Sequence, residues 1–384
     1  MLSKIRSYVP DSIKPLLRLF RYRNERKKFV REIFIRKRQN ELLQAHYSAD
    51  TAKLIVFLVI GGEWSTGRDE ISGGIISIVS ICEETATLRE IHGAATIMCT
   101  INNAHLLLKH ERFQNNTDVY RFSQLKNYFK SLTSVIIHVP ELCTATFCES
   151  LTITEQSWLK RIPAVHINVM NQNIRLMPEP SRLEKLKQLA GKVTITTAHT
   201  QYCNPHYREY FGVPIHKLSV WISPEQYQFT TWDGKENLLV VSPDPHPMKE
   251  TILKGISTIP KLTVQIIQNI TYQEYKKLVS RAKWTLTFGE GLDGYFIEPV
   301  FSGAIAFAVY NEIFFTSDFK ELPTVYDSME TLAKKIIPDM ESLDNATKFR
   351  QYQQQQFDLC AKYYSRNQYI KNIETFYSGK YTYA

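Results

Sequence analysis

Residues 284–309 read WTLTFGEGLDGYFIEPVFSGAIAFAV, and this stretch decides the expected fold. It opens with a run of strand character, Trp284 to Phe288, which a glycine-rich turn follows. A short helix is expected from Tyr295, and a second apolar strand is expected over residues 304–309. Strand, glycine turn, helix and strand in this order are typical of half a doubly wound α/β domain, so the sequence predicts a parallel sheet here.

Two glutamates belong to this stretch, Glu290 in the turn and Glu298 near the start of the expected helix. In doubly wound folds ligands bind at the carboxyl ends of the strands, where such turns lie. A carboxylate can accept two hydroxyl groups of a sugar or ribose, and the free N–H groups of a helix N-terminus suit a phosphate. The pair therefore indicates a nucleotide-sugar site. The alternative is structural: Glu290 is a loop charge, and Glu298 is favoured by the helix dipole.

The spacing around these glutamates resembles a known family. Glu290 and Glu298 are followed by Pro299, by Ser302 and Gly303, and by the apolar strand. This pattern resembles the C-terminal half of retaining glycosyltransferases with the two-domain GT-B fold. It is most similar to the fourth glycosyltransferase family, which makes polysaccharides, glycolipids and sucrose. Gly291 keeps its place in the pattern, Asp293 and Gly294 stand where the family has a glycine, and residues 304–306 read Ala-Ile-Ala instead of Thr-Pro-Val.

The resemblance implies an α/β chain of GT-B architecture, with two Rossmann-like domains that face each other across a cleft. The residues themselves predict a basic N-terminal helical arm in addition. Strand and helix signals that alternate along the chain agree with parallel sheets. We expect a basic amphipathic arm over residues 1–48, an acceptor domain over 49–223, a nucleotide-sugar donor domain over 235–340, and helices over 341–384 that return to the N-terminal domain.

A glycine pair, Gly73 and Gly74, stands where a polar loop joins an apolar helix in the first domain. Glycines at such a junction let a phosphate approach backbone N–H groups, and in the family the matching pair faces the donor diphosphate. The alternative is a tight turn with close packing. The loop before the pair is long, so its residues Trp64 and Arg68 are candidates for weak contacts with the acceptor.

Polar residues near the ends of three predicted strands form the rest of the first-domain site. His138 lies near the exit of the strand expected over residues 134–140, and a histidine at the matching strand end contacts the sugar in several family members. We therefore expect His138 to act with Glu290 in catalysis, although a lone histidine is more often structural. Weaker candidates for the acceptor site, which are also ordinary turn residues, are Asn171, Gln172, Asn173 and His199.

A proline-rich loop over residues 243–250 follows the first strand of the second domain. In the family this loop carries an arginine and then a lysine, and both meet the donor pyrophosphate. Lys249 matches the lysine, whereas no arginine stands upstream, and Arg281 is the candidate to take its place. The resemblance assigns the ribose hydroxyls to Glu298, the transferred sugar to Glu290, and the diphosphate to Gly73, Gly74, Lys249, Gly291, Asp293 and Gly294.

The chain is basic because of its first forty residues. Thirteen basic and three acidic residues give residues 1–40 a charge of +10, whereas the whole chain carries +9. Bulky apolar residues alternate with these charges, which suits an anionic membrane surface. Two alternatives are phosphate neutralisation on nucleic acid, which we do not expect, and an apolar stripe that packs on the body of the protein. Six scattered cysteines without metal-binding spacing are interpreted as reduced core thiols of a cytosolic protein.

These features lead to one functional expectation. The protein transfers a sugar from a nucleotide-sugar donor to a glycan or lipid-linked acceptor, with retention of configuration, in the synthesis of cell-surface polysaccharide. No Asp-x-Asp triplet occurs, so neither a metal nor another cofactor is required. We expect a cytoplasmic protein held peripherally on the inner face of the plasma membrane. The alternatives are a sugar-nucleotide 2-epimerase and a non-catalytic membrane scaffold of the same fold.

Overall fold

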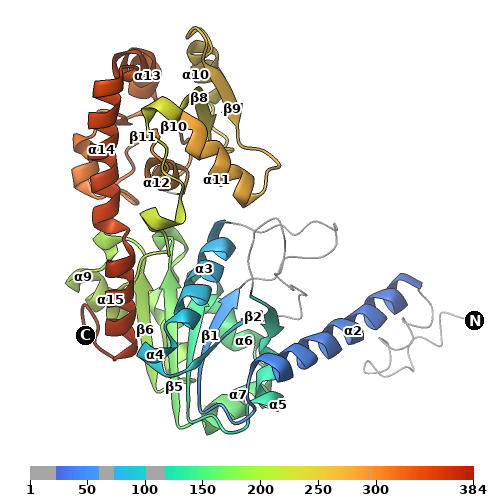
Figure 1. Ribbon diagram of the computed structural model, residues 1–384. Coiled ribbons are helices and arrows are strands. Elements are labelled where there is room, and N and C mark those ends of the chain that lie inside the picture. Colours follow the sequence, from blue (N-terminus) through green and yellow to red (C-terminus); the bar gives the residue numbers. More distant parts are fainter. Residues whose placement is uncertain (1–22, 60–72, 101–116, 293) are drawn as a thin grey trace, which may run out of the picture.

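The computed structural model describes residues 23–59, 73–100, 117–292 and 294–384. They form two domains, each built on a sheet whose neighbouring strands all run parallel (Figure 1). This arrangement confirms the α/β class and the two Rossmann-like domains expected from the sequence.

The first domain has a seven-stranded sheet in the order β3-β2-β1-β4-β5-β6-β7. The strand over residues 53–59, near the centre of the sheet, is apolar and buried from Leu54 onward, because helices cover both faces of a parallel sheet. The strands are β1 (Lys53–Val59), β2 (Ala95–Thr100), β3 (Val119–Arg121), β4 (Ser134–Pro140), β5 (Ala164–Asn171), β6 (Lys192–Thr197) and β7 (Ile215–Lys217). The helices are α3 (Gly73–Thr87), α4 (Arg89–His92), α5 (Phe122–Tyr128), α6 (Thr144–Ser150), α7 (Ile153–Arg161), α8 (Pro180–Lys187) and α9 (Pro205–Phe211).

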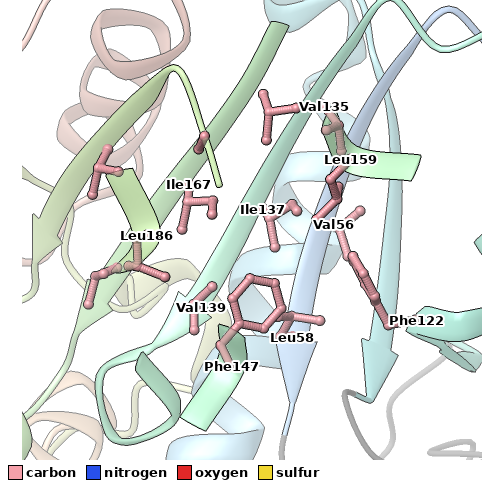
Figure 2. Packing of buried hydrophobic residues seen from close by; sticks show 14 of the residues in the cluster. Val56, Leu58, Phe122, Val135, Ile137, Val139, Phe147, Leu159, Ile167 and Leu186 are labelled. Atoms are coloured by element: carbon pink, nitrogen blue, oxygen red, sulfur yellow. The ribbon is translucent and has the colours of Figure 1, made fainter. Parts of the chain in front are cut away.

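Side chains that alternate along β1 enter two separate cores. Val56 and Leu58 belong to the core that α5, α6, α7 and α8 cover, which Figure 2 shows together with Val135, Ile137 and Ile167 of the neighbouring strands. Ile55, Phe57 and Val59 lie on the opposite face, against α3 and α15 (Arg366–Tyr377). The middle of the sheet is therefore closed on both sides, and ligands have access only at its ends.

The second domain has a five-stranded sheet in the order β12-β11-β10-β8-β9. The strand–turn–helix–strand unit expected over residues 284–309 is present as β10, α12 and β11. The strands are β8 (Glu236–Val241), β9 (Thr263–Ile266), β10 (Ala282–Leu286), β11 (Ile305–Val309) and β12 (Val325–Tyr326). The helices are α10 (Lys249–Ile256), α11 (Tyr272–Arg281), α12 (Gly294–Phe301), α13 (Met329–Leu343) and α14 (Ala346–Tyr363).

The C-terminal helices divide differently from the expectation. Residues 341–384 were expected to return as one unit to the first domain, but α14 packs in the second domain, where Phe349 and Cys360 join the core. Only α15 crosses over, and its Tyr369 and Ile373 pack beneath the first sheet. Figure 1 shows α14 against the upper domain and α15 against the lower one. The apolar side of α14 packs in the core of the second domain as far as Tyr364. The chain therefore returns to the first domain after Tyr364.

The described part of the N-terminal arm is one long helix, α2 (Arg23–His46), whose N-terminal half stands away from the body (Figure 1). Its C-terminal half is anchored: Leu43 is buried, and the Gln39 side chain donates a hydrogen bond of 2.8 Å to the Val119 carbonyl. A second apolar stripe is uncovered, with exposed fractions of 46–69% for Phe29, Val30, Ile33 and Phe34. The C-terminal half of α2 therefore packs on the body of the protein, as the structural alternative for the arm expected. The apolar side chains of its N-terminal half face solvent.

Two further observations complete the fold. No helix among the described residues is both long and apolar enough to cross a membrane. All six cysteines are free thiols, and five of them are buried while Cys148 is half-buried, in agreement with the expectation of reduced core thiols.

Candidate functional site

A cavity of about 660 Å³ lies between the two domains, at the carboxyl ends of both sheets. Its volume falls within the range of roughly 300–1,000 Å³ that is usual for small-molecule sites. Glu290 and Glu298 line it from the second domain, as expected, and residues that follow β4, β5 and β6 line it from the first. The polar and glycine residues of the wall are Gly74, Ser77, Ser80, Glu141, Gln172, Asn173, His199, Thr271, Tyr272, Tyr275, Glu290, Gly294, Tyr295, Glu298 and Tyr364.

Glu298 is nearly buried inside α12, with an exposed fraction of 9%. Its carboxylate lies close above Gly294, where a Cβ atom would come within 2.9 Å of the Glu298 Oε1 atom. The Tyr272 hydroxyl interacts with Glu298 and lies 3.1 Å from the Tyr227 hydroxyl. Burial raises the pKa of Tyr272, and the charge of Glu298 raises it further. Since α12 begins at Gly294, Glu298 lies beyond its first turn, so the helix-dipole interpretation loses its basis.

Glu290 stands in the exposed turn before α12 and reaches across the cleft. Its Oε1 atom accepts a hydrogen bond of 2.9 Å from the side-chain amide of Asn173 in the first domain. Desolvation raises the pKa of Glu290, whereas the nearby Arg175 charge and the Asn173 hydrogen bond lower it and Asp244 raises it. The turn has a backbone that requires glycine at Gly291, where φ is +92° and an added Cβ would collide with Phe315.

Two helix N-termini point toward the same cavity. Gly74, in the first turn of α3, and Gly294, the first residue of α12, both line it. The backbone N–H groups in the first turn of a helix are donors that suit a diphosphate without any side-chain charge. Gly73 begins α3 beside Gly74. Three further candidates, Trp64, Arg68 and Asp293, lie outside the described residues.

Lys249 is the first residue of α10, and its ammonium group makes two hydrogen bonds within the protein. Its Nζ atom donates to the Ser242 carbonyl at 2.6 Å and to the Asp244 carbonyl at 2.8 Å. Desolvation lowers the pKa of Lys249, and the Asp244 charge opposes this shift. Lys249 therefore stands at the carboxyl end of β8 but does not line the cavity wall.

Arg281 cannot replace the arginine that the sequence lacks. It pairs with Glu236 at 2.7 Å and 2.8 Å, and Glu236 is the first residue of β8. This pair lies at the amino end of the sheet, opposite the cleft. The cation that acts on Glu290 is Arg175 from the first domain, whose guanidinium lies 5.5 Å from the ring centre of Phe314.

The structure overturns the expected catalytic role of His138. Its side chain is fully buried in β4, where it stacks on Phe57 at 4.3 Å. One ring nitrogen lies 3.0 Å from the Tyr377 hydroxyl, and the other lies 3.0 Å from the Asn168 amide. The strand continues two residues further to Pro140, so His138 does not reach the edge of the sheet, and α15 covers it. His138 is therefore a core residue.

The weaker acceptor candidates separate into two groups. Asn171 is buried and donates to the Thr197 hydroxyl at 3.3 Å, so it is structural and does not line the cavity. Gln172, Asn173 and His199 do line it. Burial lowers the pKa of His199 to about 4, so its ring is neutral at pH 7, and it lies 2.8 Å from the Gln172 carbonyl.

Glu141 is a residue of the site that the sequence analysis did not name. Glu141 follows β4 directly, lines the cavity with an exposed fraction of 5%, and accepts a hydrogen bond of 3.0 Å from the backbone N–H of Asn173. Burial raises its pKa to about 7; backbone N–H groups oppose this shift and the Glu290 charge adds to it. An acidic residue directly after a buried strand was the signal in the sequence that could have identified it.

Solved structures of other proteins share this two-domain arrangement. Neither a family model nor a curated protein matches the sequence. A solved alpha-glucosyltransferase in complex with UDP-glucose and DNA containing an abasic site matches with a TM-score of 0.53 at 10% identity, over 85% of this chain and 99% of that one. This chain has the GT-B fold.

Other solved structures agree with the GT-B assignment. HepE from Anabaena, in complex with UDP and glucose, gives a TM-score of 0.54 at 10% identity, over 85% of this GT-B chain and 99% of HepE. The sucrose-phosphate synthase from Thermosynechococcus elongatus gives a TM-score of 0.54 at 10% identity, over 85% and 98% of the two chains. The architecture expected from the sequence is thus confirmed.

Proposed function

We propose that this chain is a glycosyltransferase that moves a sugar from a nucleotide-sugar donor to a hydroxyl group of an acceptor. One observation carries the proposal: Glu290, Glu298 and two helix N-termini meet in a single cavity between the domains. A nucleotide-sugar needs acceptors for its ribose and sugar hydroxyls and donors for its diphosphate, and this cavity supplies both. Structures of the same fold that hold UDP-glucose or UDP support the same class of donor.

The proposed roles follow from where each residue lies. Glu298 accepts the ribose hydroxyls, beside Tyr272. Glu290 contacts the transferred sugar, and the amides near Gly74 and Gly294 stabilise the negative charge that grows on the leaving diphosphate. Lys249 contributes from the carboxyl end of β8 once its ammonium group exchanges a carbonyl for a phosphate oxygen. Retention of configuration is proposed from the resemblance of the two-glutamate pattern.

The decisive experiment offers the purified protein a panel of nucleotide-sugars, with glycan and lipid-linked acceptors, and follows the products by mass spectrometry. A new glycoside, or slow hydrolysis of one donor to free sugar and nucleoside diphosphate, is expected. An epimerised donor would establish the 2-epimerase alternative. Absence of both binding and turnover with every donor would leave the scaffold alternative.

Replacement of Gly294 by alanine is expected to weaken binding of the nucleoside diphosphate about tenfold. The new methyl group would lie 2.9 Å from the Glu298 Oε1 atom, so the carboxylate must leave its position. Calorimetric titration with UDP measures the change. Gly255→Ala is the matched control, because its methyl group meets only Ile337 at an ordinary 3.7 Å within a helix. Equal affinities for both variants would contradict the role of Glu298.

We also propose that α2 holds the enzyme on an anionic membrane surface, where it meets a lipid-linked acceptor for cell-surface polysaccharide. The uncovered side chains Phe29, Val30, Ile33 and Phe34 alternate with exposed basic residues. Apolar side chains gain free energy by entering the acyl boundary, and basic side chains gain it from anionic headgroups. Of the possible partners, this combination favours a membrane over nucleic acid.

The membrane proposal predicts a large effect of two exposed aromatic residues. The variant Phe29→Ser/Phe34→Ser should bind vesicles that contain phosphatidylserine at least tenfold more weakly, because burial of each ring contributes roughly 1.5–3 kcal/mol. Vesicle flotation measures binding. Ile153→Ser removes another apolar side chain, one that is 83% exposed on α7, and should leave binding unchanged. Binding to duplex DNA but not to vesicles would contradict the proposal.

A further inference from the structure

Asn173 joins two carboxylates that belong to different domains. Its backbone N–H donates to the Glu141 Oε1 atom at 3.0 Å, and its side-chain amide donates to the Glu290 Oε1 atom at 2.9 Å. Glu141 follows β4, Asn173 follows β5, and Glu290 follows β10. A continuous polar chain therefore runs from the first sheet, through one asparagine, to the second domain.

Glu141 is an unusual group for the place where it lies. It is 95% buried yet lines the cavity, and backbone N–H groups of residues 141, 172 and 173 stabilise its charged form. Within the described ranges, no lysine or arginine lines this cavity. Burial of a carboxylate against neutral donors costs several kcal/mol relative to an apolar side chain. Such a cost at a ligand cavity points to a function rather than to stability.

We propose that Glu141 and Asn173 are positioning residues that hold Glu290 in the orientation required for sugar transfer. The inference rests on the proposed function and assigns a role within the same site. Glu141 fixes the backbone of Asn173, and the Asn173 amide then binds one oxygen of Glu290. The second oxygen of Glu290 is left to accept a hydroxyl group of the sugar. No proton or covalent bond is transferred along this chain.

The arrangement couples the geometry of Glu290 to the charge of Glu141. The ionised carboxylate accepts the Asn173 N–H as a charge-assisted bond, which is about twice as strong as a neutral one. Burial sets the pKa of Glu141 to about 7, so the strong bond forms above neutral pH and weakens below it. The Glu290 charge acts on Glu141, the Arg175 and Asp244 charges act on Glu290, and the Glu141 charge raises the pKa of the neighbouring Cys143. Burial raises the pKa of Cys143 to about 11, so this thiol stays neutral.

The first test measures the pH dependence of donor hydrolysis, with UDP-glucose as the probe or with the donor that the panel identifies. For the unmodified enzyme, kcat/KM should rise through pH 7. Glu141→Gln should be about tenfold less active at pH 8 and should lack this rise. Asn173→Ala should behave in the same way, and the double variant should be no less active than Asn173→Ala alone. Glu184→Gln, an exposed carboxylate of α8, is the control.

Two results of this test would overturn the proposal. One is a Glu141→Gln enzyme that keeps the rise through pH 7. The other is additive losses in the double variant, because residues that act in series cannot contribute independently. A residue that only stabilises the fold would lower activity without any change in the shape of the pH profile.

The second test does not depend on turnover. Hydrogen exchange of the peptide that contains residues 171–175 should accelerate about tenfold in Glu141→Gln. It should also accelerate in Glu290→Ala, because Glu290 holds Asn173 from the other domain. If exchange accelerates in Glu141→Gln but not in Glu290→Ala, the Glu141 hydrogen bond is only local, and the proposed connection from Glu141 through Asn173 to Glu290 is refuted. If no donor is bound or hydrolysed, the proposed function fails, and this exchange experiment still decides whether the two domains are joined through Asn173.

Discussion

Replacement of Glu298 by glutamine is expected to weaken binding of the nucleotide-sugar about a hundredfold. The carboxylate is nearly buried in α12 and faces the cavity beside Tyr272. A hydrogen bond to a charged group contributes roughly 1.5–3 kcal/mol, so the loss of charge from a group that accepts two hydroxyls costs about 3 kcal/mol. The variant keeps the shape of the side chain, so the free energy of unfolding should change little. Calorimetric titration with UDP, and KM for the donor, measure the effect.

The control for this prediction is Glu250→Gln. Glu250 is an acidic residue in the first turn of α10 in the same domain. Its replacement therefore measures the contribution of a favourable helix-dipole interaction to the free energy of unfolding. Its loss should cost a few tenths of a kcal/mol of stability and should leave donor affinity unchanged. If Glu298→Gln behaves like Glu250→Gln, with lowered stability and unchanged affinity, then the role proposed for Glu298 is wrong.

Acidification should destabilise the protein strongly through its buried histidines. His138 and His166 lie in neighbouring strands beneath α15, and both stack against aromatic rings of the chain. Burial lowers the pKa of His138 well below its usual value and that of His166 to about 3. The folded state therefore keeps both rings neutral at a pH where the unfolded chain binds two protons.

The direction of this effect follows from proton linkage. Because the folded pKa values lie below the unfolded value of about 6.5, the stability from neutral histidine is complete above pH 6.5 and is lost as the pH falls. A ring that stays neutral costs about 1.4 kcal/mol per pH unit, so His166 alone costs about 2 kcal/mol between pH 6.5 and pH 5, and His138 adds to the loss in the same direction. That loss is a large part of the 5–15 kcal/mol typical of a folded protein.

Urea unfolding at pH 7 and pH 5 tests this prediction. The variant His166→Asn should lose about 2 kcal/mol less than the unmodified protein over this interval, because one ring no longer titrates. The control His206→Asn removes an exposed histidine and should follow the unmodified protein. Parallel pH dependence of His166→Asn and the unmodified protein would contradict the account.

The local pattern of residues 284–309 was sufficient to predict that Glu290, Gly294 and Glu298 line the site, but it did not predict Tyr272 and Tyr275 of α11. In a strand–turn–helix unit of a parallel sheet the turn and the start of the helix lie at the carboxyl end of the strand, so Glu290 and Glu298 were expected there, and both line the cavity. The first-domain half was harder to predict, because the residue that leaves the sheet depends on where the strand ends. A shift of a few positions separates buried His138 from Glu141, which lines the cavity.

Contacts between distant parts of the chain could not be predicted from local patterns. His138 is a core residue because Tyr377, far along the sequence, covers it. Arg281 was a candidate to bind the donor phosphate because the sequence does not show at which end of the sheet this residue lies. The bond between Asn173 and Glu290 requires the relative placement of two domains, which no motif records.

The path of the chain between domains has a mechanical consequence. It passes from the first domain to the second near Trp221 and returns near Tyr364, and both residues line the cavity. These two covalent connections define an axis for relative rotation of the domains. We expect the two domains to open and close by rotation about this axis, because both covalent connections lie beside the cavity.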